Sequence, residues 1–399
     1  MRRIICGCVA FAVLMFSNVN APVFAAEAAD PAVGRWDITL GDGPTPCWLE
    51  ITKRDGQYAG RFLYISASVF ELKQVKVDGN KVEFECTGVK GGGPGHTFIG
   101  TIEGDTITGT VVPKNGEKMK WTARRFVPRI DLTGTWTIEG QDNATLRFRQ
   151  RNDRIMGVLL QNSPTRLTDI KLDGYALQFT AGDKQCAARV KGDVLEGTLG
   201  DAKFTAKRQR EWGEPIELFN GKDLTGWKPL GDPAKFNWKV VDGILHCDGR
   251  AANIVTEETF GDFKLHVEFK VPQGGNSGVY LRGRYEIQVA DSHGRPPGEH
   301  DCGGLYSRLA PKENASKPAG EWQTFDITLI DHYMTVVWNG KLVHDNVEIE
   351  GITGGAIDSK ENEPGPIYLQ GDHTSIDYRK ITLTPAKAPV EGQRRGRSR

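Results

Sequence analysis

The chain has 399 residues, among them 48 glycines, and its 51 basic and 51 acidic residues give a formal net charge of zero. A chain of this length is expected to fold into two or three domains rather than one. Because there is no excess of positive charge, bulk electrostatics give no reason to expect nucleic acid or an anionic membrane surface as a partner.

The N-terminal residues have the pattern of an export signal. Arg2 and Arg3 supply the positive start, residues 4–16 an apolar run, and residues 23–25 a small-residue cleavage site. The apolar run is too short to span a bilayer, and no later segment is long and apolar enough to do so. We therefore expect a signal peptide at residues 1–25 and a soluble protein that is exported to the periplasm or the extracellular space.

The cysteine pattern indicates neither a zinc site nor a dense disulfide framework. Five cysteines would remain after cleavage of the signal peptide: Cys47, Cys86, Cys186, Cys247 and Cys302. They are widely spaced, with no Cys-x-x-Cys pair, and their odd number leaves at least one thiol unpaired. A single disulfide between Cys47 and Cys86 is compatible with the sequence.

The first two units of the chain are an internal repeat. Residues 34–38, Gly-Arg-Trp-Asp-Ile, return at residues 134–138 as Gly-Thr-Trp-Thr-Ile, and similar pairs of segments follow in the same order. Each segment is a short alternating run bounded by Asp-Gly, Asn-Gly or Gly-Asp, which is typical of antiparallel hairpins. Units of this size curl into small barrels or sandwiches, because closure removes exposed sheet edges. We therefore predict small β-barrel repeats at residues 31–128 and 129–210. They loosely resemble lipocalin-like barrels, and we interpret them as binding or spacer modules.

A third unit is predicted at residues 214–385, and its most informative segment is Gly274–Asp291. We predict that this segment is one strand, and because side chains alternate along a strand, it has two unlike faces. One face carries Leu281, Tyr285, Ile287 and Val289, and the other carries Tyr280, Arg282, Arg284, Glu286 and Gln288. The second set offers fixed donors, acceptors and a flat ring, which suits a sugar with many hydroxyl groups. The alternative is a solvated face with Arg–Glu ion pairs.

Several motifs of the third unit occur in the order found in one known family. They include residues 218–227 (Leu-Phe-Asn-Gly-Lys-Asp-Leu-Thr-Gly-Trp), 276–282 (Asn-Ser-Gly-Val-Tyr-Leu-Arg), 285–291 (Tyr-Glu-Ile-Gln-Val-Ala-Asp) and 365–373 (Gly-Pro-Ile-Tyr-Leu-Gln-Gly-Asp-His). The unit resembles the 3-keto-disaccharide hydrolase family, formerly a domain of unknown function. The chain departs from the family pattern at Gln323, Thr374 and Lys380. The resemblance implies a concanavalin A-like jelly-roll β-sandwich, so we expect an all-β chain with a jelly roll behind two small antiparallel barrels. Residues 386–399 are expected to form a disordered basic tail.

The acidic residues of the third unit argue against a direct glycosidase. Such an enzyme needs two carboxyl groups that flank the bond, about 5–5.5 Å or about 6.5–9.5 Å apart. The Glu-x-Asp-x-x-Glu motif of jelly-roll laminarinases is absent, and Glu286 is followed by the amide Gln288. The resemblance implies a different route, in which a sugar already oxidised at C3 loses its acidified C2 hydrogen, eliminates the glycosidic oxygen and then adds water.

This route needs one base and groups that stabilise an enolate. We predict Glu286 or His373 as the base and Arg282 as the group that supplies positive charge. The predicted substrate-binding residues are Tyr280, Arg284, Gln288, His300, Asp301, Trp322 and Gln370. If arginines paired with Glu286, however, its pKa would fall and it would be a weaker base.

No cofactor is assigned from the sequence. A divalent metal is conceivable if Glu286, His300, Asp301 and His373 converge, since it would polarise the keto oxygen. Nothing in the spacing of these residues requires a metal, and the metal stays unassigned.

The leading hypothesis is an exported hydrolase or lyase that acts on 3-keto-glycosides supplied by a separate sugar 3-oxidoreductase. One alternative is a non-catalytic, lectin-like protein of the cell envelope that binds an oligosaccharide, because one fold hosts both enzymes and binders. A second alternative is a structural envelope protein.

Overall fold

The computed structural model describes residues 30–388, except for 42, 44–45, 65–67, 87–94, 114–116 and 142. The predicted signal peptide (1–25) and residues 389–399 of the predicted tail lie outside the described residues. The predicted all-β class is confirmed: the described part contains strands and one short 3₁₀ turn, Pro233–Lys235. In this part of the chain, no helix has the length and apolar character that crossing a membrane requires.

The first unit is a curled antiparallel sheet in the order β4-β3-β2-β1-β9-β8-β7-β6-β5. Its strands are β1 (Gly34–Leu40), β2 (Cys47–Arg54), β3 (Gln57–Leu63), β4 (Val69–Leu72), β5 (Val75–Asp78), β6 (Lys81–Cys86), β7 (His96–Glu103), β8 (Thr106–Pro113) and β9 (Met119–Arg125). The two edges of the sheet approach each other, because β3 contacts β5 and β4 contacts β6. The interior is filled by aromatic and aliphatic side chains, including Trp36, Phe62, Phe98 and Trp121.

The second unit is a closed barrel in which each strand pairs with the next and β17 pairs with β10. Its strands are β10 (Gly134–Ile138), β11 (Thr145–Arg151), β12 (Arg154–Leu160), β13 (Thr165–Asp173), β14 (Ala176–Ala181), β15 (Lys184–Lys191), β16 (Val194–Leu199) and β17 (Ala202–Arg208). The small-barrel fold predicted for both units is confirmed.

Both barrels have the same corner at the start of their first strand. Trp36 and Trp136 each donate an indole hydrogen bond, 3.0 Å long, to the carbonyl four residues earlier. A guanidinium group covers each ring, Arg125 at 4.1 Å and Arg208 at 5.5 Å from the ring centroid. The corner therefore explains why a glycine, an intervening residue and a tryptophan occur at both positions of the sequence.

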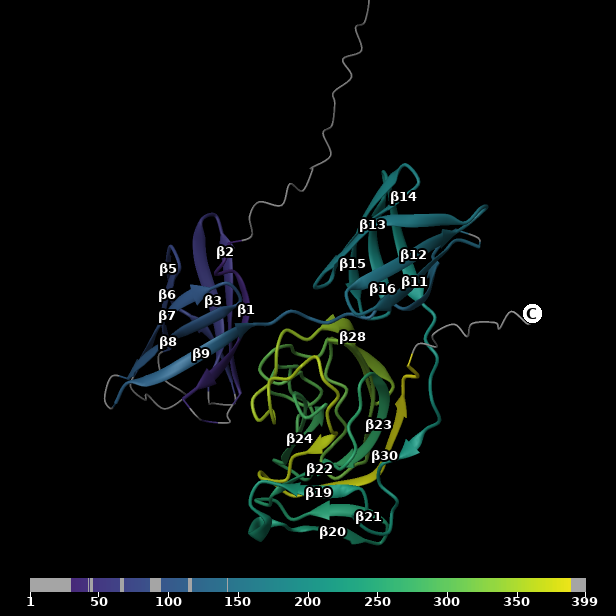
Figure 1. Ribbon diagram of the computed structural model, residues 1–399. Helices are drawn as coiled ribbons and strands as arrows, with labels where there is room; N and C mark the ends of the chain where they lie inside the picture. The colour runs from purple at the N-terminus through teal and green to yellow at the C-terminus, as the bar shows by residue number, and fades with distance from the viewer. Residues whose placement is uncertain are drawn as a thin grey trace, which may run out of the picture.

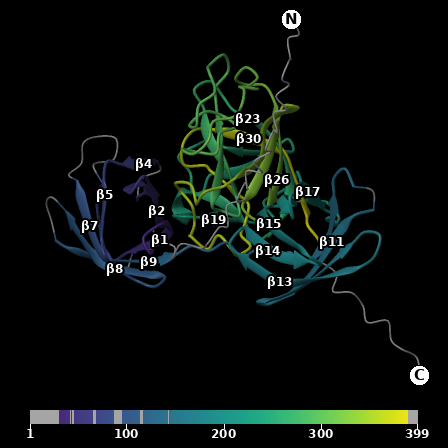
Figure 2. The same ribbon diagram turned by 90° about the horizontal axis from the view of Figure 1, so that it is seen from above.

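The third unit is a sandwich of two antiparallel sheets with one hydrophobic core between them. The larger sheet has the order β20-β21-β30-β23-β26-β27-β28, with β18 paired to β30, and the smaller sheet has the order β19-β22-β29-β24-β25. Their strands are β18 (Ile216–Glu217), β19 (Trp227–Leu230), β20 (Trp238–Val241), β21 (Ile244–Cys247), β22 (Asn253–Thr256), β23 (Phe263–Lys270), β24 (Asn276–Leu281), β25 (Tyr285–Ala290), β26 (Gln323–Ile330), β27 (Tyr333–Trp338), β28 (Lys341–Glu348), β29 (Tyr368–Leu369) and β30 (Ile376–Pro385). The two barrels lie on different sides of this sandwich (Figures 1 and 2).

The prediction of one strand across Gly274–Asp291 is wrong. The segment is a hairpin, in which β24 and β25 pair from Asn276–Ala290 to Leu281–Tyr285. Arg282 and Gly283 form its turn with φ values of 52° and 67°, and Arg284 N donates to Leu281 O. Sequence reasoning missed this turn because Arg-Gly is not one of the usual two-residue hairpin signals.

The disulfide between Cys47 and Cys86 is not formed in the structure. Both side chains are buried in the core of the first barrel, and Cys86 is a free thiol. Burial raises the pKa of Cys47 to about 12 and that of Cys86 to about 11, so neither side chain is a reactive thiolate at neutral pH.

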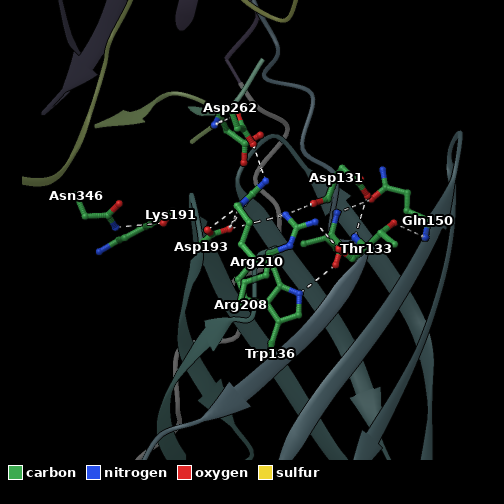
Figure 3. Close-up of polar contacts among 12 residues, drawn as sticks. Asp131, Thr133, Trp136, Gln150, Lys191, Asp193, Arg208, Arg210, Asp262 and Asn346 are labelled. Atoms are coloured by element: carbon green, nitrogen blue, oxygen red, sulfur yellow. Dashed lines mark hydrogen bonds and ion pairs between the residues drawn. The ribbon is translucent and has the colours of Figure 1, made fainter. Parts of the chain in front are cut away.

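The second barrel is attached to the sandwich by polar contacts (Figure 3). Arg210, which follows β17, forms an ion pair with Asp193 of the barrel at 2.8 Å and another with Asp262 of the sandwich at 2.9 Å. Asn346 donates to Lys191 O across the same contact at 3.1 Å. Arg210 therefore bridges the two domains.

Asp331 is buried beside this bridge and carries an unusual proton affinity. Its pKa is raised to about 7, first by burial and then by the charge of Asp262, while neighbouring arginines oppose the shift. One oxygen of the Asp331 carboxyl has no hydrogen-bond partner in the described structure. A neutral side chain of the same shape should therefore fit this position better above pH 7.

We predict that Asp331→Asn makes the protein more stable at pH 8 than the wild type, by roughly 1–2 kcal/mol, and gains less at pH 5. The folded-state pKa lies above the ordinary aspartate value of 3.8, so the stability that Asp331 contributes at low pH is lost as the pH rises through about 7. Asparagine also tolerates the φ of 51° at this position. Urea unfolding at both pH values measures the difference, with the exposed Asp153→Asn as control. Equal gains at pH 5 and pH 8 would contradict the assignment.

Candidate active site

The smaller sheet of the sandwich has one face in the core and one face that carries polar and aromatic groups. Alternate residues of the hairpin, from Val279 to Val289, lie in the core. Tyr280, Glu286 and Gln288 belong to the other face, as the alternation predicts. Successive strand partners extend this face as a row, in which Glu286 opposes Tyr280, Tyr280 opposes Tyr368, and Tyr368 opposes Val255.

Glu286 is the central group of this face. Its side chain is only 3% exposed, and no lysine or arginine forms an ion pair with it in the described part of the chain. Burial raises its pKa to about 8, a hydrogen bond from Tyr280 opposes the shift, and the charge of Asp372 adds to it. Glu286 therefore exchanges its proton near neutral pH, which suits a general acid or base.

Small residues make room for the Glu286 carboxyl. Gly278 lies opposite Gln288, and a Cβ atom at Gly278 would stand 2.3 Å from Glu286 Oε1. In the orientation of the Gln288 amide that satisfies both of its ends, the nitrogen donates to Glu286 Oε1 at 3.2 Å and to Ser277 O at 2.8 Å. Gln288 thus orients the carboxyl without neutralising it.

Tyr280 connects the carboxyl to the neighbouring strand. Its hydroxyl lies 2.8 Å from Glu286 Oε2 and 2.9 Å from Gly354 O. Its ring stacks on Tyr368 with centroids 4.1 Å apart and planes 10° apart. The Tyr368 hydroxyl accepts a hydrogen bond from Asn253. Two parallel rings and a carboxyl therefore form one continuous surface.

Asp372 and His373 follow β29 at the edge of this face. His373 Nδ1 lies 2.8 Å from Asp372 Oδ1, and this hydrogen bond raises the pKa of His373. Both side chains are about half exposed, at 47% and 50%. Since the charge of Asp372 also shifts the pKa of Glu286, the pair lies within electrostatic reach of the carboxyl.

The loop at residues 292–305 runs along the open edge of β25. Gly303 N donates to Gln288 O, and Gln288 N donates to Gly304 O. His300 packs edge-on against Tyr306 with centroids 4.9 Å apart, and Tyr306 N donates to Glu286 O at 3.0 Å. The loop therefore brings His300 and Tyr306 to the rim of the face.

Comparison with known proteins identifies the third unit. Residues 214–384 match the model of the 3-keto-alpha-glucoside-1,2-lyase-like domain. Residues 214–384 therefore form a domain of this family. A protein from Bacteroides thetaiotaomicron named 3-keto-disaccharide hydrolase is 25% identical over 32% of this chain and 54% of the relative, so the chain spans about half the length of the curated relative it matches.

Two solved structures of candidate glycosyl hydrolases from Parabacteroides distasonis are also similar. One is 32% identical and covers 42% of this chain and 82% of its own, with a TM-score of 0.37. The other is 26% identical and covers 43% and 98%, with a TM-score of 0.34. The family assignment rests on the sequence match.

Within this 3-keto-alpha-glucoside-1,2-lyase-like domain, Arg282 and Arg284 do not share the face of Glu286, contrary to the prediction. Arg282 lies in the hairpin turn and Arg284 follows it. Arg282 pairs with Asp262 at 2.8 Å and Arg284 with Asp358 at 2.6 Å. Both arginine side chains are buried in these contacts. The objection that arginines would lower the pKa of Glu286 therefore does not apply.

Two other predicted substrate-binding residues have different neighbours. Trp322 lies against Lys270 and Arg379, at 5.0 and 4.5 Å from the ring centroid, on the outer face of the larger sheet. It is therefore not a stacking platform for this site. Asp301 pairs with Arg295 at 3.0 Å, whereas His300 packs against the ring of Tyr306.

The remaining predicted residue, Gln370, does belong to the face. It lies next to Tyr368, its backbone N donates to Gly278 O, and its side-chain oxygen has no partner in the described structure. No group of three or more His, Cys, Asp or Glu side chains within the described ranges is placed to hold a metal ion. Glu286, His300, Asp301 and His373 thus do not converge as a metal site among these residues.

Sequence reasoning missed four residues of the site: Asn253, Tyr306, Thr353 and Tyr368. Tyr368 lies in a motif that marked the family, but Tyr306 and Tyr368 each stand more than ten residues from the hairpin. Only the register of the sheet and the return of the loop bring them to Glu286. A pattern within one strand carries no such information.

We predict that Arg282→Ala lowers the free energy of unfolding by about 3–5 kcal/mol, because it leaves the carboxylate of Asp262 with one partner fewer in a buried contact. Urea unfolding measures the change. Arg379→Ala is the control, since this exposed arginine pairs with Glu268 on the outside of the sheet and should cost less than about 1 kcal/mol. A stable Arg282→Ala protein would show that the turn does not depend on the ion pair.

Proposed function

We propose that this protein is an exported enzyme that cleaves 3-keto-glycosides by removal of the C2 proton, elimination and hydration. The observation that carries the proposal is the buried Glu286 carboxyl, which has no counter-ion among the described residues and has a pKa of about 8. It lies on a face with stacked tyrosines, in a domain whose family and named relative are 3-keto-glycoside enzymes.

A single base of this kind suits elimination better than direct glycoside hydrolysis. Direct hydrolysis needs one acid and one carboxylate on opposite sides of the bond. The neighbour of Glu286 on its own strand face is the amide Gln288, and Asp372 is engaged with His373. In contrast, the C2 hydrogen beside a ketone is acidic enough for one matched base.

The proposed steps balance as follows. Ionised Glu286 takes the C2 proton, the electron pair forms an enolate, and the C1–O bond breaks as the enolate collapses to an enone. The leaving oxygen receives a proton from His373, whose pKa the neighbouring Asp372 raises. Water then adds at C1, Glu286 returns a proton to C2, and the water proton replaces the one that His373 gave. The net reaction is hydrolysis.

The proposal also concerns the source of the substrate and the compartment in which the protein acts. The substrate must already carry a ketone at C3, so a separate sugar 3-oxidoreductase would produce it. The export pattern of residues 1–25 supports a location in the periplasm or outside the cell.

We expect the wild type to release free sugar from a 3-keto-disaccharide but not from the unoxidised disaccharide, and Glu286→Gln to lower kcat by about 10²–10⁴-fold. The reaction should be run in D2O, because elimination and hydration place solvent deuterium at C2 whereas direct substitution at C1 does not. Glu268→Gln, on the outer face of the larger sheet, is the control and should keep its activity. Tight binding of the unoxidised sugar in calorimetry, without turnover of the oxidised one, would instead favour a lectin-like protein.

The pH dependence of kcat/KM gives a second test. The base must be ionised, so the rate should fall about tenfold for each pH unit below 8, the pKa of Glu286. Tyr280→Phe removes a donor that favours the ionised carboxyl, and its acidic limb should therefore move to higher pH. The control is Tyr333→Phe, which loses a hydrogen bond to Glu348 elsewhere and should leave the profile in place. An acidic limb near pH 4 in the wild type would contradict Glu286 as the base.

A further inference from the structure

Trp48 lies on the outside of the first barrel, yet it is fully buried. In β2, Cys47, Leu49 and Ile51 point into the core of the barrel. Trp48 and its strand partner Leu63 instead belong to the hydrophobic core of the sandwich. The first barrel therefore supplies part of the core of another domain.

The indole of Trp48 binds one carbonyl of the sandwich. Its Nε1 donates to Ile352 O at 3.0 Å, and Arg308 donates to the same oxygen at 2.7 Å. The Arg308 guanidinium also lies 4.0 Å above the Trp48 ring. Gly351 has a φ of 97°, and a Cβ atom there would stand 3.1 Å from the indole, so this segment fits closely against Trp48.

The two residues that follow this carbonyl contact the hairpin that carries Tyr280 and Glu286. Thr353 Oγ1 accepts a hydrogen bond from Glu286 N at 2.9 Å, and Thr353 N donates to Arg284 O at 3.0 Å. Gly354 O accepts from the Tyr280 hydroxyl at 2.9 Å. One or two peptide units therefore separate the Trp48 contact from Tyr280 and Glu286.

A second contact of the first barrel reaches the rim of the site. Val69 N donates to Ser307 Oγ at 3.0 Å, and Ser68 hydrogen-bonds with the side chain of Tyr306. Tyr306 N is bound to Glu286 O. The barrel thus approaches Glu286 from both the 352–354 segment and the 306–307 segment.

A buried ion pair holds the barrel in this position. Arg35 of β1 lies 2.6 Å from Glu361, and their side chains are only 11% and 0% exposed. Glu361 also accepts a hydrogen bond from Tyr285, the residue before Glu286. Removing one partner of such a pair costs several kcal/mol, so the barrel is not a loosely tethered module.

We propose that the first barrel maintains the geometry of the candidate active site. Trp48 is a positioning residue: it holds the 352–354 segment in place, and this segment in turn holds Tyr280 and Glu286. This inference rests on the proposed function for its kinetic consequences. Its structural part, the coupling of Trp48 to the amide of Glu286, does not depend on any substrate.

The test compares Trp48→Phe with Trp36→Phe in the full chain. Both changes keep a buried ring and remove one indole hydrogen bond of 3.0 Å. The acceptor of the Trp36 bond lies in its own barrel, whereas the acceptor of the Trp48 bond lies in the sandwich. Trp48→Phe should lower kcat on a 3-keto-disaccharide about fivefold to tenfold with little change in KM, and should shift the acidic limb of the pH profile. Trp36→Phe should change neither kcat nor the acidic limb, although it should alter the melting temperature about as much as Trp48→Phe does.

Amide hydrogen exchange separates this inference from the proposed function. Trp48→Phe should speed exchange in segments 349–357 and 285–287, and Trp36→Phe should not. If the wild type turns over no 3-keto-glycoside, the proposed function fails while the exchange result still decides the positioning role. Equal exchange in the two variants, or equal kcat and pH profiles, would overturn the inference.

Ser68→Ala provides a second variant in case Trp48→Phe does not fold. It removes only the hydroxyl that contacts Tyr306. We expect a rise in KM of about threefold and faster exchange at 305–307, with an unchanged melting temperature. The control is Thr52→Ala, which removes an exposed hydroxyl elsewhere on the same barrel. A Ser68→Ala protein identical to this control in both measurements would count against the inference.

Discussion

The candidate site depends on one constraint, the burial of Glu286 without a counter-ion in the part of the chain that the structure describes. A buried charged carboxylate is costly, so the group holds its proton more tightly and its pKa rises to about 8. The surrounding face supplies one phenol, one amide and the empty space above Gly278. These neighbours orient the carboxyl but do not neutralise it. A carboxyl that exchanges its proton near neutral pH is thereby obtained from packing alone. Contacts from other elements must maintain that packing.

The two barrels share a corner around Trp36 and Trp136 but are attached to the sandwich in different ways. The first barrel inserts Trp48 into the hydrophobic core of the sandwich. The second is attached by ion pairs and amide contacts around Arg210, whose side chain is only 9% exposed, and by the ring of Tyr175 against that of Tyr333, with centroids 5.4 Å apart. Both attachments therefore combine buried polar contacts with ring packing. They differ in that Trp48 of the first barrel enters the core of the sandwich and contacts the segment beside the candidate site.

Hairpin turns and alternation were sufficient to predict the all-β class, the small barrels and the face that Tyr280, Glu286 and Gln288 share. The same alternation misplaced Arg282, because it assumes an unbroken strand and the backbone turns at that residue with a positive φ. Tyr368 could not be found in this way. Its contact with Tyr280 arises from strand register between segments far apart in the chain, which no local pattern encodes.

The displaced arginines explain how the hairpin is held at its other end. Arg282 binds one oxygen of Asp262, and Arg210 from the second barrel binds the other. The carboxylate that fixes the turn of the site hairpin is thus shared with the attachment of the second barrel. The first barrel contacts the same hairpin from the side of Glu286, through the 352–354 segment. Both barrels are therefore linked to one hairpin. A sandwich without them would lose Trp48 and Leu63 from its core, together with restraints on the residues of the candidate site.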